Sequence, residues 1–168
     1  MRAGRVAATL LGIIAFLAPG VGALAQPQSP TAWAQFHYDA AHTGFNPSET
    51  ALSPETVSGL RPIWVRKPSF TAIEASPAIA GGRLFISATG ASDIWAMNER
   101  TGAPLWADRA SDSSPALAGG LVMFGATRTF RANQASSGTQ VWAKAPPGGP
   151  GGSPVVAQGR VISGQRGL

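Results

Sequence analysis

The sequence of 168 residues contains no cysteine, few charged residues and only two histidines. The absence of cysteine excludes disulfides, thiolate metal sites, a thiol nucleophile and a lipidated bacterial N-terminus. Charged residues make up 12% of the chain, about half the usual share. This scarcity argues against a charged helical bundle and against a solvated polyelectrolyte. Beyond the N-terminal region, no segment sustains a helical pattern of apolar residues for more than two turns.

Glycine and proline, in contrast, are abundant. The chain has 21 glycines and 14 prolines, about a fifth of its residues where about an eighth is usual. Hydrophobic residues reach 44%. This composition favours many short strands joined by tight turns, and therefore an all-β fold. A length of 168 residues would ordinarily predict one domain.

The N-terminus has the pattern of a secretory signal peptide. Basic residues in Met1–Arg5 precede an apolar run over Val6–Leu17, and Ala23-Leu24-Ala25 is an A-x-A cleavage site. A membrane anchor would need about 20 unbroken apolar residues, and this run is shorter. We therefore expect residues 1–25 to be removed and the mature protein to be secreted or periplasmic.

The remaining charges are scattered. Without Arg2 and Arg5, eleven basic side chains face eight acidic ones, and Arg66-Lys67 is the only adjacent basic pair. Because phosphate binding requires clustered cations, the sequence argues against nucleic acid as the main partner. No membrane span is expected after the leader is removed. The expected partner is a protein or a small molecule of unknown identity.

A repeat of about 38 residues occupies the second half of the chain. Ser76-Pro77 recurs as Ser114-Pro115 and Ser153-Pro154, each time followed by an apolar pair, a turn and a second apolar run. The first two copies continue with a third strand, a Thr-Gly or Ser-Gly turn, and a fourth strand that contains Trp106 or Trp142. Four short strands at this period predict the blade of a β-propeller.

These features predict a partial β-propeller with four-stranded antiparallel blades. Trp64 ends a repeat that has no first three strands before it, so we expect residues 60–67 to be the outer strand of a closing blade. We expect the ring to be incomplete and the isolated chain to be prone to aggregation. The predicted divisions are a signal peptide at 1–25, a lead segment at 26–59, an outer strand and linker at 60–75, blade repeats at 76–112 and 113–150, and a truncated repeat at 151–168.

The repeat resembles the pyrroloquinoline-quinone-like (PQQ-like) repeat. That repeat builds eight-bladed propellers in quinoprotein alcohol dehydrogenases and in the propeller lipoprotein of the outer-membrane barrel-assembly machinery. The run from Phe36 to Pro47 is similar to the N-terminal lead of secreted members. The resemblance implies that Trp64, Trp106 and Trp142 are wedges packed against neighbouring blades. The alternative for each tryptophan is stacking on a quinone cofactor.

Candidate chemistry is sparse. His37 and His42 flank Asp39, and a metal role would need a third firm ligand, so structural packing is the favoured interpretation. Glu74-Ala75-Ser76-Pro77 is similar to a stretch whose acid helps to hold the quinone in quinoprotein dehydrogenases. Those enzymes follow it with an adjacent cysteine pair, which this chain lacks, and their calcium ligands come from later blades. We therefore interpret Glu74 as a solvated acid and assign no catalytic, cofactor-binding or metal-binding residue.

Two functions remain open on the sequence. The favoured one is a non-catalytic binding or scaffolding module that requires no cofactor. The alternative is the N-terminal part of a PQQ-dependent quinoprotein dehydrogenase, which would use pyrroloquinoline quinone with calcium. The repeat is shared by enzymes and non-enzymes, so it predicts the fold more firmly than the activity.

Overall fold

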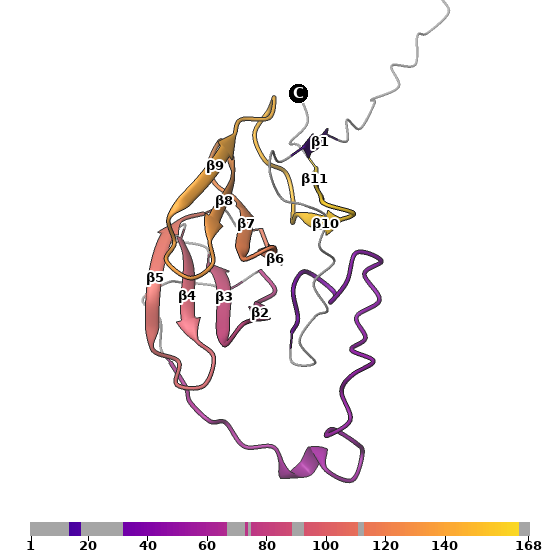
Figure 1. The fold of residues 1–168 in the computed structure, drawn as a ribbon. Helices are drawn as coiled ribbons and strands as arrows, with labels where there is room; N and C mark the ends of the chain where they lie inside the picture. Colours follow the sequence, from indigo (N-terminus) through magenta and orange to yellow (C-terminus); the bar gives the residue numbers. More distant parts are fainter. Residues whose placement is uncertain are drawn as a thin grey trace, which may run out of the picture.

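The structure is a computed structural model that describes residues 14–17, 32–66, 73, 75–88, 93–110 and 113–164. Within these residues the protein is all-β, with three antiparallel sheets and no α-helix (Figure 1). Two of the sheets have four strands in sequential order, and the third has three strands. The all-β prediction and the prediction of four-stranded antiparallel blades are therefore confirmed.

Each four-stranded sheet is one blade of the predicted repeat. The first blade contains β2 (Ala78–Ala80), β3 (Arg83–Ala88), β4 (Asp93–Asn98) and β5 (Pro104–Arg109). The second blade contains β6 (Ala116–Ala118), β7 (Leu121–Gly125), β8 (Phe130–Gln134) and β9 (Gln140–Lys144). The third sheet contains the hairpin of β10 (Val155–Ala157) and β11 (Arg160–Ser163), with β1 (Ile14–Leu17) beside β11.

A tight two-residue turn joins the first two strands of each repeat. Gly81 and Gly82 have φ angles of 59° and 73°, and Gly119 and Gly120 have 55° and 76°. Two successive residues with positive φ are typical of the type I′ turn, whose twist matches that of the paired strands. The third hairpin uses Gln158 at the first position, with φ of 49°. The predicted hairpins are thus present at all three repeats.

The first two blades also share an irregularity in register. In the first blade the pairing shifts between Ala96 and Met97, and in the second it shifts between Ala132 and Asn133. The preceding pair is an alanine opposite the tryptophan of the outer strand in both cases. A bulge at one position increases the local twist of a strand pair. The repeat is therefore conserved between the two blades down to this detail of the backbone.

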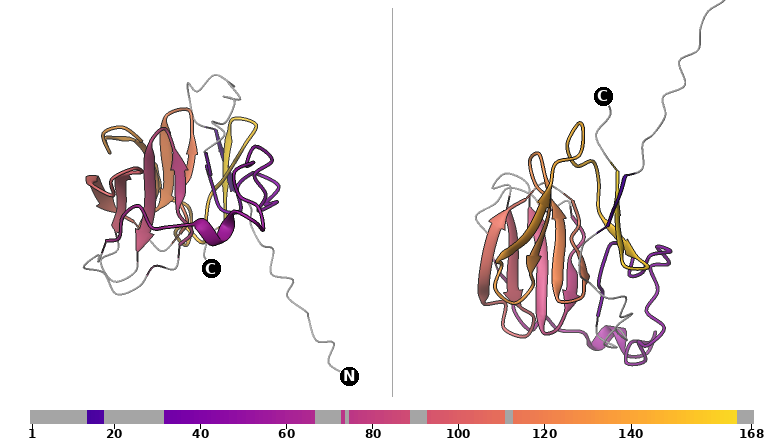
Figure 2. Two further views of the ribbon diagram at one scale, coloured as in Figure 1. Left: turned by 90° about the horizontal axis from the view of Figure 1, so that it is seen from below. Right: turned by 45° about the horizontal axis from the view of Figure 1, so that its top comes forward.

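The hydrophobic core lies between the sheets. Phe85, Ile94 and Ala96 of the first blade are buried against Val122 and Phe124 of the second. A second buried cluster joins β7 and β8 to Val161 of β11. Because side chains alternate along a strand, each blade has one face for the preceding blade and one for the following blade. Figure 2 shows the first two sheets stacked face to face.

The segment before the first blade is irregular. Residues 32–66 loop around one end of the molecule and contain a single 3-10 turn, η1 (Val57–Gly59) (Figure 1). Residues 60–66, predicted as part of an outer strand, form no strand in the structure. β1 lies inside the predicted leader and pairs antiparallel with β11. The division into a leader, a lead and blade repeats stays a prediction.

Candidate functional site

The two histidines lie in a turn that its own side chains hold together. The Asp39 carboxylate accepts hydrogen bonds from the backbone nitrogens of Ala41 and Thr43, at 3.1 and 3.0 Å, and from the Thr43 hydroxyl at 2.7 Å. These hydrogen bonds, chiefly the one from the Thr43 hydroxyl, hold the pKa of Asp39 below its ordinary value of 3.8. Asp39 therefore organises the turn.

The histidine rings pack on an aromatic neighbour. His37 stacks on Phe36 with ring centroids 4.1 Å apart, and His42 meets Phe36 edge-on at 5.6 Å. His37, Tyr38 and His42 all have positive φ, an uncommon conformation for residues other than glycine. Among the described residues, no group of three or more histidine, aspartate or glutamate side chains is arranged to hold a metal ion. The histidines' observed contacts are aromatic packing.

Glu74, the candidate quinone contact, lies outside the described residues. Ala75, which follows it, is buried, and Ser76 donates its backbone N–H to the Ser114 hydroxyl at 2.9 Å. The chain next to Glu74 is thus fixed to the second blade.

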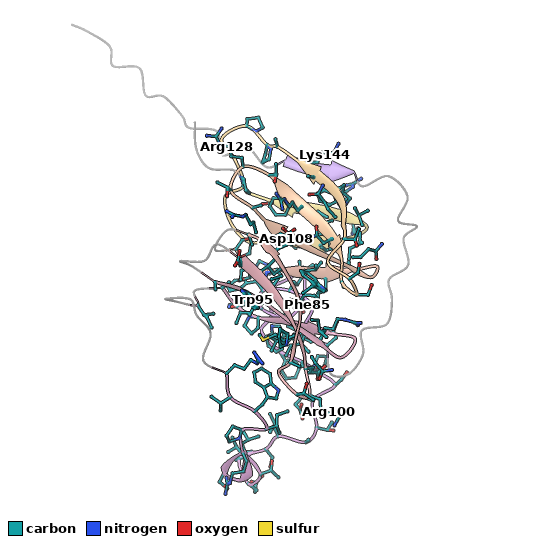
Figure 3. The ribbon with its side chains drawn as sticks, turned by 90° about the vertical axis from the view of Figure 1, so that its left-hand side faces the viewer. Phe85, Trp95, Arg100, Asp108, Arg128 and Lys144 are labelled. Carbon is teal, nitrogen blue, oxygen red and sulfur yellow. The ribbon has the colours of Figure 1, made fainter. Side chains whose placement is uncertain are left out.

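A charged cluster that the sequence did not predict joins the first two blades. Asp108 of β5, which is labelled in Figure 3, accepts hydrogen bonds from Arg131 at 3.1 Å and from the Asn133 amide at 2.8 Å. Both donors come from β8. Asn133 is fully buried and also donates to the carbonyl of Gly138. The Asp108 and Arg131 side chains are 27% and 28% exposed. This cluster fixes two blades relative to each other.

Trp64 and Trp106 each contact the blade that follows them in the sequence, and we call each of these contacts a tryptophan joint. The Trp64 indole N–H donates to the carbonyl of Glu99 at 2.8 Å, and its ring lies on Gly102. Trp106 likewise donates to the carbonyl of Ala135 at 3.1 Å and lies on Gly138. A Cβ atom at either glycine would come within 2.7 Å of the indole. The predicted wedge role is therefore observed for these two tryptophans.

The serines of the Ser-Pro pairs, which precede the innermost strands, also connect successive repeats. The Ser114 hydroxyl accepts the backbone N–H of Ser76, and the Ser153 hydroxyl accepts that of Ser114, both at 2.9 Å. Each serine therefore satisfies the backbone donor of its equivalent in the preceding repeat. The sequence showed the recurrence of this serine but not its contact.

The lead segment crosses the innermost strands of all three sheets. Trp33 exchanges two backbone hydrogen bonds of 2.8 Å with Ile79, and the Ala34 carbonyl accepts the N–H of Leu117 at 2.7 Å. The buried Gln35 side chain accepts the N–H of Val156 at 2.9 Å. Ile79, Leu117 and Val156 occupy equivalent positions in the three repeats. Three successive lead residues thus hold three successive repeats.

One pocket lies at the end of the second blade. It has a volume of about 420 Å³ and is lined by Thr127, Arg128, Ala145, Pro146, Gly148 and Gly149. Arg128, which is labelled in Figure 3, is exposed and is the charged residue of this lining. Pro146, Gly148 and Gly149 of this lining lie in the chain that follows β9. Its lining pairs no nucleophile with a base.

No helix in the part of the chain that the structure describes is long and apolar enough to cross a membrane. The polar contacts described above are used to hold turns and blades together.

A family model matches the part of the chain that contains the repeats. Residues 90–167 match the model described as outer membrane protein assembly factor BamB. No curated protein sequence matches the chain significantly.

Solved structures match over a wider range. A quinohemoprotein alcohol dehydrogenase from Comamonas testosteroni is 25% identical, with a TM-score of 0.65 over 81% of this chain and 23% of its own. One from Pseudomonas putida HK5 is 21% identical, with a TM-score of 0.69 over 83% of this chain and 23% of its own. BamB from Moraxella catarrhalis is 19% identical, with a TM-score of 0.52 over 60% of this chain and 33% of its own.

The chain thus spans about a quarter to a third of the length of these structures. The repeat region of this chain is therefore of the PQQ-like kind, and its four-stranded sheets form neighbouring blades of a β-propeller.

Proposed function

We propose that this protein is a secreted or periplasmic, non-catalytic module that binds or scaffolds a protein or a small molecule. The observation that carries the proposal is the use of its polar side chains. Asp108, Arg131 and Asn133 join two blades, the indoles of Trp64 and Trp106 donate to backbone carbonyls of the following blade, and the hydroxyls of Ser114 and Ser153 accept from the preceding repeat. The assembly-factor description of the matching family model supports this proposal.

The second candidate is part of a PQQ-dependent dehydrogenase. It is favoured by the 25% identity to a quinohemoprotein alcohol dehydrogenase over 81% of this chain. Calcium in proteins needs six to eight oxygen ligands. The described carboxylates of Asp39, Glu49 and Asp108 already accept hydrogen bonds from neighbouring groups.

One assay separates the two candidates. The purified chain is incubated with pyrroloquinoline quinone and calcium, and dye reduction is followed with alcohols and sugars as substrates. We expect no turnover above the level of free quinone. Turnover that depends on the protein would contradict the non-catalytic proposal. If the chain does not bind the quinone in equilibrium dialysis, the dehydrogenase alternative is wrong.

The location has its own test. When the chain is produced in a Gram-negative bacterium with its own N-terminus, we expect the protein in the periplasm to begin at Gln26. Mass spectrometry of the N-terminal peptide measures this directly. A cytoplasmic protein that keeps residues 1–25 would contradict the proposed leader. Removal of the leader would also remove β1 and leave the edge of β11 without that partner.

A further inference from the structure

The pocket at the end of the second blade lies between two loops that backbone hydrogen bonds close. The Gly149 N–H donates to the Pro146 carbonyl at 3.0 Å, and the φ of Gly148, 73°, fits the third position of a type II turn. In the loop between β7 and β8, the Ala126 N–H donates to the Thr129 carbonyl at 2.7 Å. Both walls of the pocket are therefore held by the chain itself.

The lining offers several unused hydrogen-bond donors. Within the described residues, the Arg128 guanidinium forms no ion pair, and neither it nor the Thr127 hydroxyl has a hydrogen-bond partner. The backbone N–H groups of Thr127, Arg128 and Gly148 donate to no backbone carbonyl in the same part of the chain. All three residues are exposed. Their donors are therefore available to a ligand that supplies acceptors.

The charge of the lining determines the sign of the ligand. Arg128 is a lining residue, and no acidic residue lines this pocket. A guanidinium can bind a carboxylate or a phosphate group through two parallel hydrogen bonds, and such charge-assisted bonds are about twice as strong as neutral ones. The lining therefore favours an anion.

The size and the apolar part of the lining favour a small organic molecule. The volume of about 420 Å³ lies towards the lower end of the range for small-molecule sites. Ala145 and the buried Pro146 supply apolar surface in the same lining as the donors. A ligand that combines an anionic group with a short apolar part matches both kinds of surface.

We propose that this pocket binds a small organic anion that carries a carboxylate or a phosphate group. The anionic group binds to the Arg128 guanidinium and the Thr127 hydroxyl, and the organic part packs on Ala145 and Pro146. The inference rests on the proposed role as a binding module, and it names the class of small molecule that the module takes.

Two anionic probes and a neutral probe test the site. Benzoate, phenyl phosphate and benzamide are added in turn to the full chain labelled with ¹⁵N. We expect at least one of the two anions, but not benzamide, to shift the amide signals of Thr127, Arg128 and Gly148 at millimolar concentrations. The stronger of the two anions identifies the group that the site prefers. Added sodium chloride should weaken the binding, because salt screens exposed charges.

Arginine variants test the role of the charge. Arg128→Gln should weaken binding of the preferred anion about three- to tenfold, because an exposed charge-assisted hydrogen bond is lost. Arg128→Lys should lose less, because it keeps the charge without the planar fork of donors. Arg100→Gln is the matched control, since it removes an exposed arginine at the opposite end of the sheets and should leave the affinity unchanged (Figure 3).

The proposal is overturned if neither anion shifts these amide signals, or if benzamide shifts them to the same extent. It is equally overturned if Arg128→Gln binds the anion as tightly as the unmodified chain, or if Arg100→Gln weakens the binding as much as Arg128→Gln does. These results are independent of the quinone assay. Turnover with quinone would contradict the non-catalytic function and leave the anion site in place, whereas failure of anion binding would leave that function untouched.

Discussion

At the scale of single residues, the glycines under the tryptophans are the most constrained positions. Gly138 and Gly120 have almost the same φ, 77° and 76°, but their surroundings differ. A Cβ at Gly138 would lie 2.7 Å from Trp106, whereas nothing lies within 4 Å of the corresponding point at Gly120. Alanine substitutions at these two glycines therefore separate the effect of backbone strain from the effect of a steric clash.

We expect Gly138→Ala to destabilise the protein more than Gly120→Ala. Both variants should lose about 1 kcal/mol through the unfavourable φ. Gly138→Ala should lose a further 1–3 kcal/mol or so, because Trp106 must move out of its site. Urea denaturation followed by tryptophan fluorescence measures the difference. Equal losses in the two variants would show that the tryptophan joint does not stabilise the native state.

Asp39 should make the histidine turn sensitive to acid. Its pKa is lowered in the folded protein because Thr43 donates hydrogen bonds to the carboxylate. The stabilisation is therefore complete above about pH 3.8 and is lost as the pH falls through the lower pKa of the folded state. NMR titration of the Thr43 amide should show this transition below pH 3.8. In Asp39→Asn the transition should be absent; its persistence would assign it to another group.

A structural feature could be predicted from the sequence where it is local or where it recurs in each repeat. The Gly81-Gly82 turn and the Trp106 wedge were predictable, because a turn needs particular residues and a repeat displays its own period. The bond from Arg131 to Asp108 was not predictable. It depends on the angle at which two blades stack, and the two residues have no counterpart pair in the neighbouring repeat, where Lys144 replaces Asp108.

At the scale of structural elements, the lead segment and the blades stabilise one another. Residues 33–35 contact β2, β6 and β10 in order, at equivalent positions of the three repeats. These hydrogen bonds to a segment far away in the sequence add to the serine, tryptophan and Asp108 contacts that join successive sheets. No motif in residues 33–35 predicted these contacts, because they depend on where the inner strands end up.

Gln35→Ala should loosen the third-sheet hairpin. The Val156 N–H would lose its acceptor, at a cost of about 1–3 kcal/mol for a donor left without a partner. Hydrogen exchange at Val156 should therefore become faster, while exchange in β3 and β7 stays slow. Gln134→Ala, which removes an exposed glutamine, is the control and should leave Val156 unchanged. Unchanged protection in Gln35→Ala would mean that the hairpin is held by its other contacts.

At the scale of the whole molecule, the stacking of blades leaves one apolar segment exposed. Residues 60–66 are anchored by Trp64, yet Ile63 and Val65 are each 78% exposed, and the segment pairs with no strand in the described part of the chain. An extended apolar segment with unpaired backbone groups is a template for association with other chains.

We expect the purified chain to self-associate through this segment. The combined change Ile63→Lys and Val65→Lys should reduce the association, because the charges repel one another and remove the apolar surface. Val57→Lys, at another exposed apolar residue in η1, is the control. Light scattering across a range of concentrations measures the effect. A wild-type chain that stays monomeric and unfolds cooperatively would contradict this expectation.

The sequence by itself determined the units: four short strands, glycine turns at fixed places and a tryptophan on each outer strand. It did so because hairpin geometry and burial of a strand face depend on residues close together in the chain. The tertiary structure decided how the units meet: serine to serine, Asp108 to Arg131 and Asn133, and three lead residues across three inner strands. Those contacts depend on the rotation between sheets, which local residue patterns do not specify.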